Sequence, residues 1–104
     1  PDDQKLTLEI ARVIRLGFLQ QNAFHADDTF VPIEKQKLMM ETIIYLYKKA
    51  KQLISASIPI SQIMEYGLFD KLTKMKYDVP NNNLELFENY KKEIDESFEE
   101  ILKI

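Results

Sequence analysis

The sequence contains no cysteine, two glycines and one histidine, and each shortage excludes a class of site. Without cysteine there can be neither disulfides nor thiolate metal ligands, and the redox compartment cannot be inferred. A phosphate-binding loop needs clustered glycines so that backbone N–H groups can surround the anion, but Gly17 and Gly67 lie far apart in the chain. The chain therefore cannot hold a triphosphate by such a loop.

Candidate catalytic and metal-binding residues are equally sparse. His25 has only Asp27 and Asp28 as nearby potential ligands, and a cap formed by Asp28 or Thr29 explains this group as well as a metal does. No serine stands beside a candidate base or in a glycine elbow, and helical charge patterning accounts for the carboxylates near the C-terminal end. We predict no metal site and no catalytic residue, so a free-standing enzyme is not expected.

Neither a basic patch nor a long apolar run is present. The net charge is −3 with intermixed signs, which does not suit a phosphate backbone, so nucleic acid is not an expected partner. No apolar run approaches the roughly 20 residues that cross a bilayer, and the start Pro1–Gln4 has no signal-peptide character. We expect a soluble chain. Because it begins with Pro1 rather than methionine, we also expect a fragment of a longer protein.

Helix-forming residues are abundant, which predicts an all-α fold. The 104 residues, 45% of them hydrophobic, fit one domain over residues 1–104, a single bundle of about four to five helices. The first helix is expected from about Asp3 to about Gln20, with Asp2 and Asp3 capping it. A second, longer helix should follow Pro32, flanked by lysines including Lys35. Its predicted apolar stripe comprises Ile33, Met40, Ile43, Ile44, Tyr47, Ala50 and Ile54.

The second half of the chain is predicted to be more broken. Pro59 predicts a bend within residues 55–61, after which Ser61 should cap a short helix that Gly67 ends. Another short helix is expected around Leu72, and the run 78–83 interrupts the chain again. The last helix should bury one face, formed by Leu84, Phe87, Tyr90, Ile94, Phe98 and Ile101.

The segment from Phe18 to Phe24 places three consecutive amides, Gln20, Gln21 and Asn22, between two aromatic residues. Amides donate and accept hydrogen bonds, and an aromatic ring can stack on a flat ligand such as a nucleobase. Alternatively, the phenylalanines are core residues at a helix end and the amides cap a turn. The chemistry of the residues leaves both readings open.

Longer motifs resemble a known family. They are the run from Phe18 to His25, followed by Asp28-Thr29-Phe30 and Glu34-Lys35-Gln36; the similarity extends over Leu8–Arg15 and Ile58–Ile60. From about Leu6 onward the chain resembles the C-terminal helical domain of the catalytic A subunit of archaeal-type and vacuolar-type rotary ATP synthases.

The resemblance implies that an upstream domain of the same chain holds ATP or ADP with Mg²⁺, while this bundle closes the adenine side of the pocket. It identifies Phe24 as the ring against adenine and Ala23 as its neighbour, with Gln20, Gln21 and Asn22 shaping the wall. No tight nucleotide binding by the fragment alone is expected.

Partners implied by the resemblance are the upstream nucleotide-binding domain, the central rotor stalk and the non-catalytic B subunit. The setting would be cytoplasmic, peripheral to the membrane through the complex, in ATP synthesis or hydrolysis coupled to ion transport. The bend at residues 55–60 would face the rotor, or would be an ordinary helix connection. The alternative function is a helical protein-interaction module without nucleotide contact, in which Phe18 and Phe24 are both buried or both touch protein.

Overall fold

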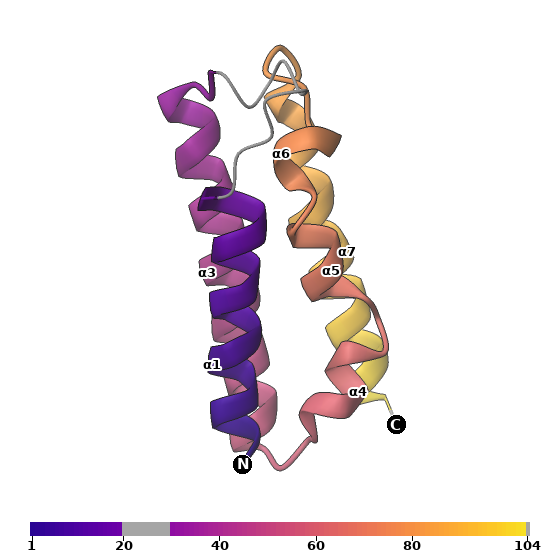
Figure 1. Ribbon diagram of the computed structural model, residues 1–104. Helices are drawn as coiled ribbons and strands as arrows, with labels where there is room; N and C mark the ends of the chain where they lie inside the picture. The colour runs from indigo at the N-terminus through magenta and orange to yellow at the C-terminus, as the bar shows by residue number, and fades with distance from the viewer. Residues whose placement is uncertain (20–29, 104) are drawn as a thin grey trace.

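The structure, a computed structural model, describes residues 1–19 and 30–103. Two long helical segments form one layer: α1 (Asp2–Val13), which continues as the π-helix η1 (Ile14–Leu19), and α3 (Ile33–Ser55), which runs antiparallel beside it (Figure 1). The described residues contain no strand, so the predicted all-α class is confirmed for this part of the chain.

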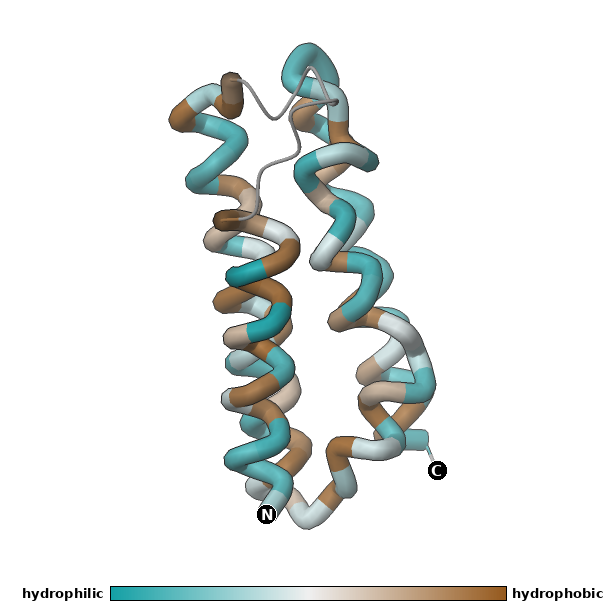
Figure 2. The backbone as a smooth tube through the Cα atoms, in the orientation of Figure 1, coloured by the Kyte–Doolittle hydropathy of each residue, from teal (hydrophilic) through white to brown (hydrophobic). Residues whose placement is uncertain are grey.

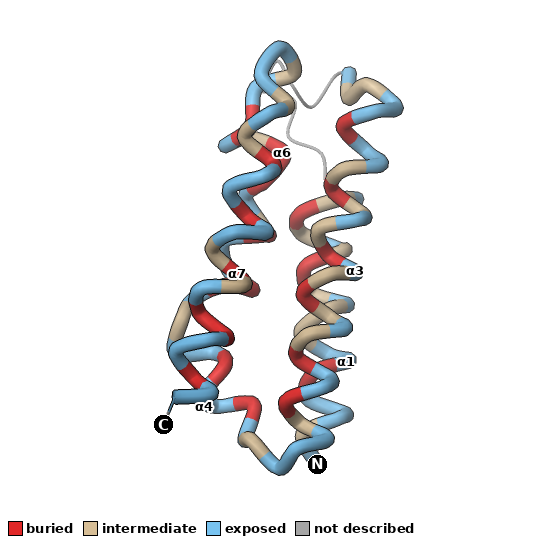
Figure 3. Tube along the Cα trace, turned by 180° about the vertical axis from the view of Figure 1, so that it is seen from behind, coloured by how far each residue is buried: buried red, intermediate tan, exposed pale blue. Residues whose placement is uncertain are grey.

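The other layer combines several short helices with one long one (Figures 1 and 3). The short elements are α4 (Ile60–Met64), α5 (Leu68–Leu72), α6 (Met75–Asp78) and the 3-10 helix η2 (Leu84–Leu86), and α7 (Phe87–Leu102) follows. The two short helices predicted between residues 61 and 75 are therefore three, because a turn at Thr73 and Lys74 separates α5 from α6.

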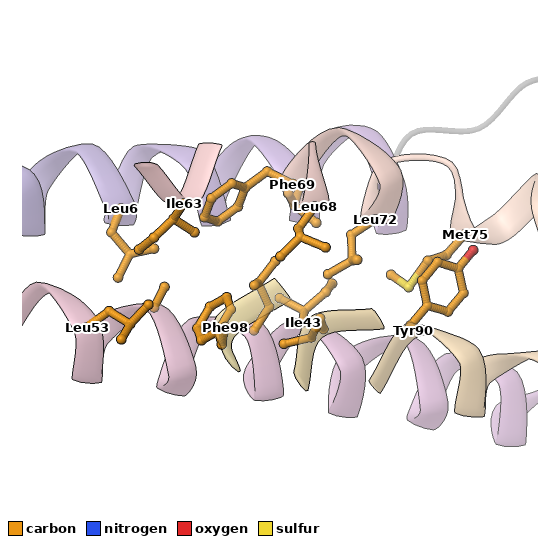
Figure 4. Close-up of a cluster of buried hydrophobic side chains, with 14 of the residues drawn as sticks. Leu6, Ile43, Leu53, Ile63, Leu68, Phe69, Leu72, Met75, Tyr90 and Phe98 are labelled. Carbon is orange, nitrogen blue, oxygen red and sulfur yellow. The ribbon is translucent and has the colours of Figure 1, made fainter. Parts of the chain in front are cut away.

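The core lies between these layers, as Figure 4 shows for part of it. Leu6 of α1 lies beside Ile63 of α4, and Phe98 of α7 lies on the same side of the core as Ile43 of α3. All five residues predicted for the buried face of α7 from Phe87 onward are buried, and Leu84 packs against them. Burying a side chain of this kind contributes about 1.5–3 kcal/mol, so this cluster is the main source of stability.

The predicted apolar stripe on α3 is correct at Ile43 and Ala50, which are buried, and at Tyr47 and Ile54, which pack against the core, but it is wrong at two other isoleucines. Ile33 and Ile44 are exposed, and the buried face comprises Lys35, Met39, Ile43, Leu46, Ala50 and Leu53. Both sets have helical spacing, so periodicity alone could not choose between them. The true face was hidden because a lysine occupies its first position.

Two predicted helix caps are also wrong. Neither Asp2 nor Asp3 caps α1, and Ser61 does not cap α4, which begins one residue earlier. Instead the carboxylate of Asp2 accepts a hydrogen bond from the backbone N–H of Ile60 at 3.0 Å. One acidic residue thus satisfies the first turn of a helix 58 positions away in sequence.

Both glycines have backbone roles. Gly67 has φ +66°, a left-handed conformation, and it separates α4 from α5 as predicted. Gly17 is buried where η1 meets the end of α5, and a Cβ there would lie 2.8 Å from the carbonyl oxygen of Leu72. The missing side chain therefore allows close backbone packing.

Candidate functional site

The predicted site lies in the first connection, residues 20–32 between η1 and α3. Its proposed adenine wall (Gln20, Gln21, Asn22, Ala23 and Phe24) falls outside the described residues. The residues on both sides are described, and they fix where the connection leaves the bundle and where it returns. The site is therefore built from its two flanks.

At the departing flank, Phe18 is partly buried and packs against the hydrophobic core. This packing agrees with the reading of Phe18 as a core residue. The next residue, Leu19, is exposed. The second aromatic, Phe24, lies outside the described residues.

At the returning flank, a buried lysine organises the chain. The Nζ of Lys35, whose residue is fully buried, donates to the carbonyl oxygen of Lys76 at 2.8 Å and to Oδ1 of Asn81 at 2.8 Å. The Nδ2 of Asn81 in turn donates to the carbonyl oxygen of Phe30 at 2.9 Å. We call these four residues the lysine network, and it ties the first connection to the chain after α6.

A neighbouring side chain adds to this anchoring. Gln36 donates from Nε2 to the carbonyl oxygen of Val31 at 2.9 Å, and its backbone N–H donates to Pro32. Consecutive carbonyl groups of residues 30–32 are thus satisfied by α3 and by Asn81. The sequence pattern places Lys35 on the flank of the helix and Asn81 in a chain break, and no local signal in the sequence connects the two.

Large apolar side chains are exposed on both flanks. Leu19 is 65% exposed, Phe30 68% and Ile33 79%. Leu19 is the last residue of η1 and Ile33 the first of α3, and Figure 2 shows brown positions at both places, which lie at different levels along the bundle. We call these three residues the apolar end. They flank the first connection in sequence, one before it and two at its return.

A groove of about 430 Å³ lies between α3 and the start of α7. Leu38, Leu84 and Phe87 line its apolar part, and glutamates 41, 85 and 88 with a single lysine, Lys91, stand around it. The carboxylates would repel a polyphosphate, so this groove does not suit a nucleotide. It suits an uncharged or basic protein segment better.

Beside this groove the Tyr45 hydroxyl donates to the carboxylate of Asp95. Burial and this acceptor together raise the pKa of Tyr45 to about 12, so the phenol stays protonated at neutral pH. Tyr45 also lies under the ammonium groups of Lys49 and Lys91, with 5.5 Å and 5.2 Å to the ring centroid. The group links α3 to α7, which is a structural role.

The second connection, residues 56–59 between α3 and α4, is a tight turn. The backbone N–H of Ile58 donates to the carbonyl of Leu53 at 2.9 Å, and Ser57 adopts φ +66°. These bonds satisfy the carbonyl groups at the end of α3 within the turn itself. They account for the bend as a helix connection, and its contact with a rotor stays a prediction.

Residues 1–19 and 30–103 contain no group of three or more side chains that could hold a metal ion. His25, Asp27 and Asp28, the weak candidates from the sequence, lie outside these ranges. Among the described helices, none is long and apolar enough to cross a membrane.

Comparison with known proteins identifies the family. Residues 1–64 match the sequence profile described as the C-terminal domain of V and A type ATP synthase. This is more than half of the chain, and it includes the whole first connection. The chain belongs to this family.

Similar proteins agree with this assignment. The V-type ATP synthase alpha chain 2 of Clostridium tetani is 43% identical over 103 residues, which cover 99% of this chain and 17% of the relative. The V-type ATP synthase alpha chain of Halothermothrix orenii is 46% identical over 98 residues, covering 94% and 17%. The A subunit of the A-type ATP synthase of Methanopyrus kandleri is 39% identical over 104 residues, covering 99% and 17%.

The resemblance proposed from the sequence motifs is confirmed by these matches. This ATP synthase domain spans about a sixth of the length of the curated relatives it matches. The match therefore covers a minor part of each relative.

Proposed function

We propose that this chain is the C-terminal domain of the catalytic A subunit of a rotary ATP synthase and that its first connection closes the adenine side of the nucleotide pocket. Phe24 stacks on the base, Ala23 lies beside it, and Gln20, Gln21 and Asn22 shape the wall. An upstream domain of the same subunit holds the phosphates and Mg²⁺. The main support for this proposal is that the family match, over residues 1–64, contains these five residues.

Two features of the described residues support this proposal. The three residues of the apolar end flank the first connection in sequence and are exposed, which leaves them available to a packing domain. The lysine network fixes the returning chain at Phe30, and a pocket wall needs such fixed support.

The wider assignment follows from the relatives, whose names are those of ATP synthase subunits. In the assembled enzyme the domain contacts the upstream domain, the central rotor stalk and the non-catalytic B subunit. The enzyme makes or hydrolyses ATP and couples this to ion transport, protons included. The domain lies on the cytoplasmic side and reaches the membrane only through the complex.

Magnitudes restrict what the isolated chain can do. Stacking of a base on an aromatic ring is worth about 1–3 kcal/mol, whereas a millimolar dissociation constant already needs about 4 kcal/mol. The 104-residue chain should therefore show no saturable ATP binding below about 1 mM. Saturable shifts at micromolar ATP in an NMR titration would contradict this.

The test of the pocket uses the assembled enzyme with two substitutions at one position. Phe24→Ala should raise the dissociation constant for ATP about 5- to 150-fold, the equivalent of one lost stacking contact. Phe24→Tyr keeps the ring and should stay within about threefold of the wild type on the same scale. If Phe24→Ala leaves ATP affinity unchanged, the adenine wall is elsewhere.

A helical protein-interaction module is the second candidate, and the groove between α3 and α7 favours it. In this case a partner segment would occupy the apolar part beside Leu38 and Phe87. The double substitution Glu41→Lys and Glu88→Lys would then weaken assembly, while Phe24→Ala would leave the affinity for ATP unchanged. Measuring assembly and ATP affinity on the same variants separates the two functions.

A further inference from the structure

The lysine network joins three segments that are distant in sequence. Lys35 belongs to the first turn of α3, Asn81 follows α6, and Phe30 lies in the returning part of the first connection. The Lys35–Asn81 pair spans 46 positions and the Asn81–Phe30 pair spans 51. Contacts of this kind determine where a connection sits relative to the bundle.

Asn81 is suited to this position because its amide has both a donor and an acceptor. Its Oδ1 accepts from the Lys35 ammonium at 2.8 Å, and its Nδ2 donates to the carbonyl oxygen of Phe30 at 2.9 Å. An ammonium group has only donors, so it could not bond to the amide nitrogen if the amide were reversed. The lysine therefore fixes the orientation in which Asn81 holds Phe30.

The position of Lys35 is itself fixed. The residue is fully buried, and its Nζ also donates to the carbonyl oxygen of Lys76 at 2.8 Å. Charge-assisted bonds of this kind are shorter and stronger than neutral ones. The network thus connects Phe30 to a buried part of the bundle.

We propose that Lys35 and Asn81 are positioning residues of the nucleotide pocket, which hold the returning end of the first connection so that its wall residues meet the base. This inference rests on the proposed function. Neither side chain is required to touch nucleotide; both act through the backbone of Phe30. The ligand class concerned is a purine nucleoside triphosphate.

The decisive substitution is Asn81→Asp in the assembled enzyme. It keeps an oxygen for Lys35 but removes the N–H donor and sets a carboxylate oxygen against the carbonyl of Phe30. We expect the ATP dissociation constant to rise about fivefold or more, as for the loss of one hydrogen bond. UTP, whose smaller base depends less on the wall, should lose less affinity, so the preference for ATP over UTP falls.

A neighbouring residue offers a matched control. Asn82 is exposed in the same run, and Asn82→Asp introduces the same charge without touching Phe30. Asn81→Ala is the second variant if Asn81→Asp fails to fold, since it removes both bonds without adding charge. A purely structural role would lower the melting temperature or the active fraction while leaving the ATP-to-UTP preference unchanged.

Three outcomes decide the matter when Phe24→Ala is measured alongside. A lowered ATP preference in Asn81→Asp but not in Asn82→Asp supports the proposal. Equal behaviour of the two aspartate variants, with Phe24→Ala still impaired, overturns the positioning role and leaves the proposed function intact. No effect of Phe24→Ala removes the proposed function, and the positioning role with it.

Discussion

The two ends of α3 are held in different ways. At its C-terminal end the second connection closes in four residues, with backbone bonds at Leu53 and Ile54 and the Asp2 carboxylate on the N–H of Ile60. At its N-terminal end the first connection is longer, and side chains from outside it hold its returning end: Asn81 on Phe30 and Gln36 on Val31.

The two connections also differ in how far the apolar residues around them are exposed. Around the second connection Leu53 and Ile60 are buried and Ile58 packs against the core, whereas Phe30 and Ile33 project at the other end. The second connection thus covers its apolar groups within the bundle and takes one hydrogen-bond acceptor, Asp2, from α1. We infer that the first connection is shaped for contact with the rest of the subunit, whereas the second mainly closes the fold.

The largest loss of stability is expected when the anchoring of the first connection is removed. Lys35→Met keeps the length of the side chain but removes the donors to Lys76 and Asn81, which should cost about 2–4 kcal/mol of the free energy of unfolding. Lys37→Met, exposed on the same helix, should stay within about 0.5 kcal/mol. Urea unfolding of both variants measures the difference. Equal values would mean that the lysine network does not anchor this end.

A second substitution tests where the first connection departs. Gly17→Ala places a Cβ 2.8 Å from the carbonyl oxygen of Leu72 and 3.0 Å from the Cα of Thr73, so backbone must move. We expect a loss of about 1–3 kcal/mol in thermal or urea unfolding, as for an overpacked core. Gly67→Asn, at an open left-handed position, is the control and should lose less. A neutral Gly17→Ala would show that η1 does not need this close approach.

The second connection should respond more mildly. Asp2→Ala removes the acceptor for the N–H of Ile60, which should cost about 0.5–2 kcal/mol, as for other helix caps. Asp2→Asn retains an oxygen acceptor and should recover most of the loss. Unfolding curves of the two variants that coincide would show that this bond contributes nothing specific.

The smallest expected effect is an increase in stability at the second connection. Ser57 has φ +66°, which glycine adopts without strain, so Ser57→Gly should raise the free energy of unfolding by up to about 1 kcal/mol. Ser57→Val should lower it, because a β-branched residue tolerates this conformation poorly. Melting temperatures in the opposite order would mean that the turn does not require the left-handed backbone.

The sequence was most informative where contacts are local. The regular spacing on α7 predicted its buried residues, including Ile94 and Phe98, and Gly67 predicted the end of a helix. On α3 the pattern predicted Ile43 and Ala50 correctly but missed Lys35, which lies on the buried face where a lysine is not expected.

The remaining features depend on residues that are far apart in the chain. The bond from Ile60 to Asp2 and the chain from Lys35 through Asn81 to Phe30 have no periodic or motif signature, so only the fold reveals them. The candidate site itself came from the amide and aromatic run and its family resemblance. The residues of the bundle that hold this site in place could not be predicted from that run.

The central claim is that the first connection, and not the second, meets the adenine ring. The most direct measurement is photolabelling of the assembled enzyme with ATP that carries an azide on its adenine, followed by tryptic digestion. The sequence places all five wall residues and the adjoining parts of both flanks in one peptide, residues 16–35, and the second connection in another, residues 52–71. Label in peptide 16–35 that excess ATP abolishes is the predicted result; label in peptide 52–71, or none in peptide 16–35, would contradict the account.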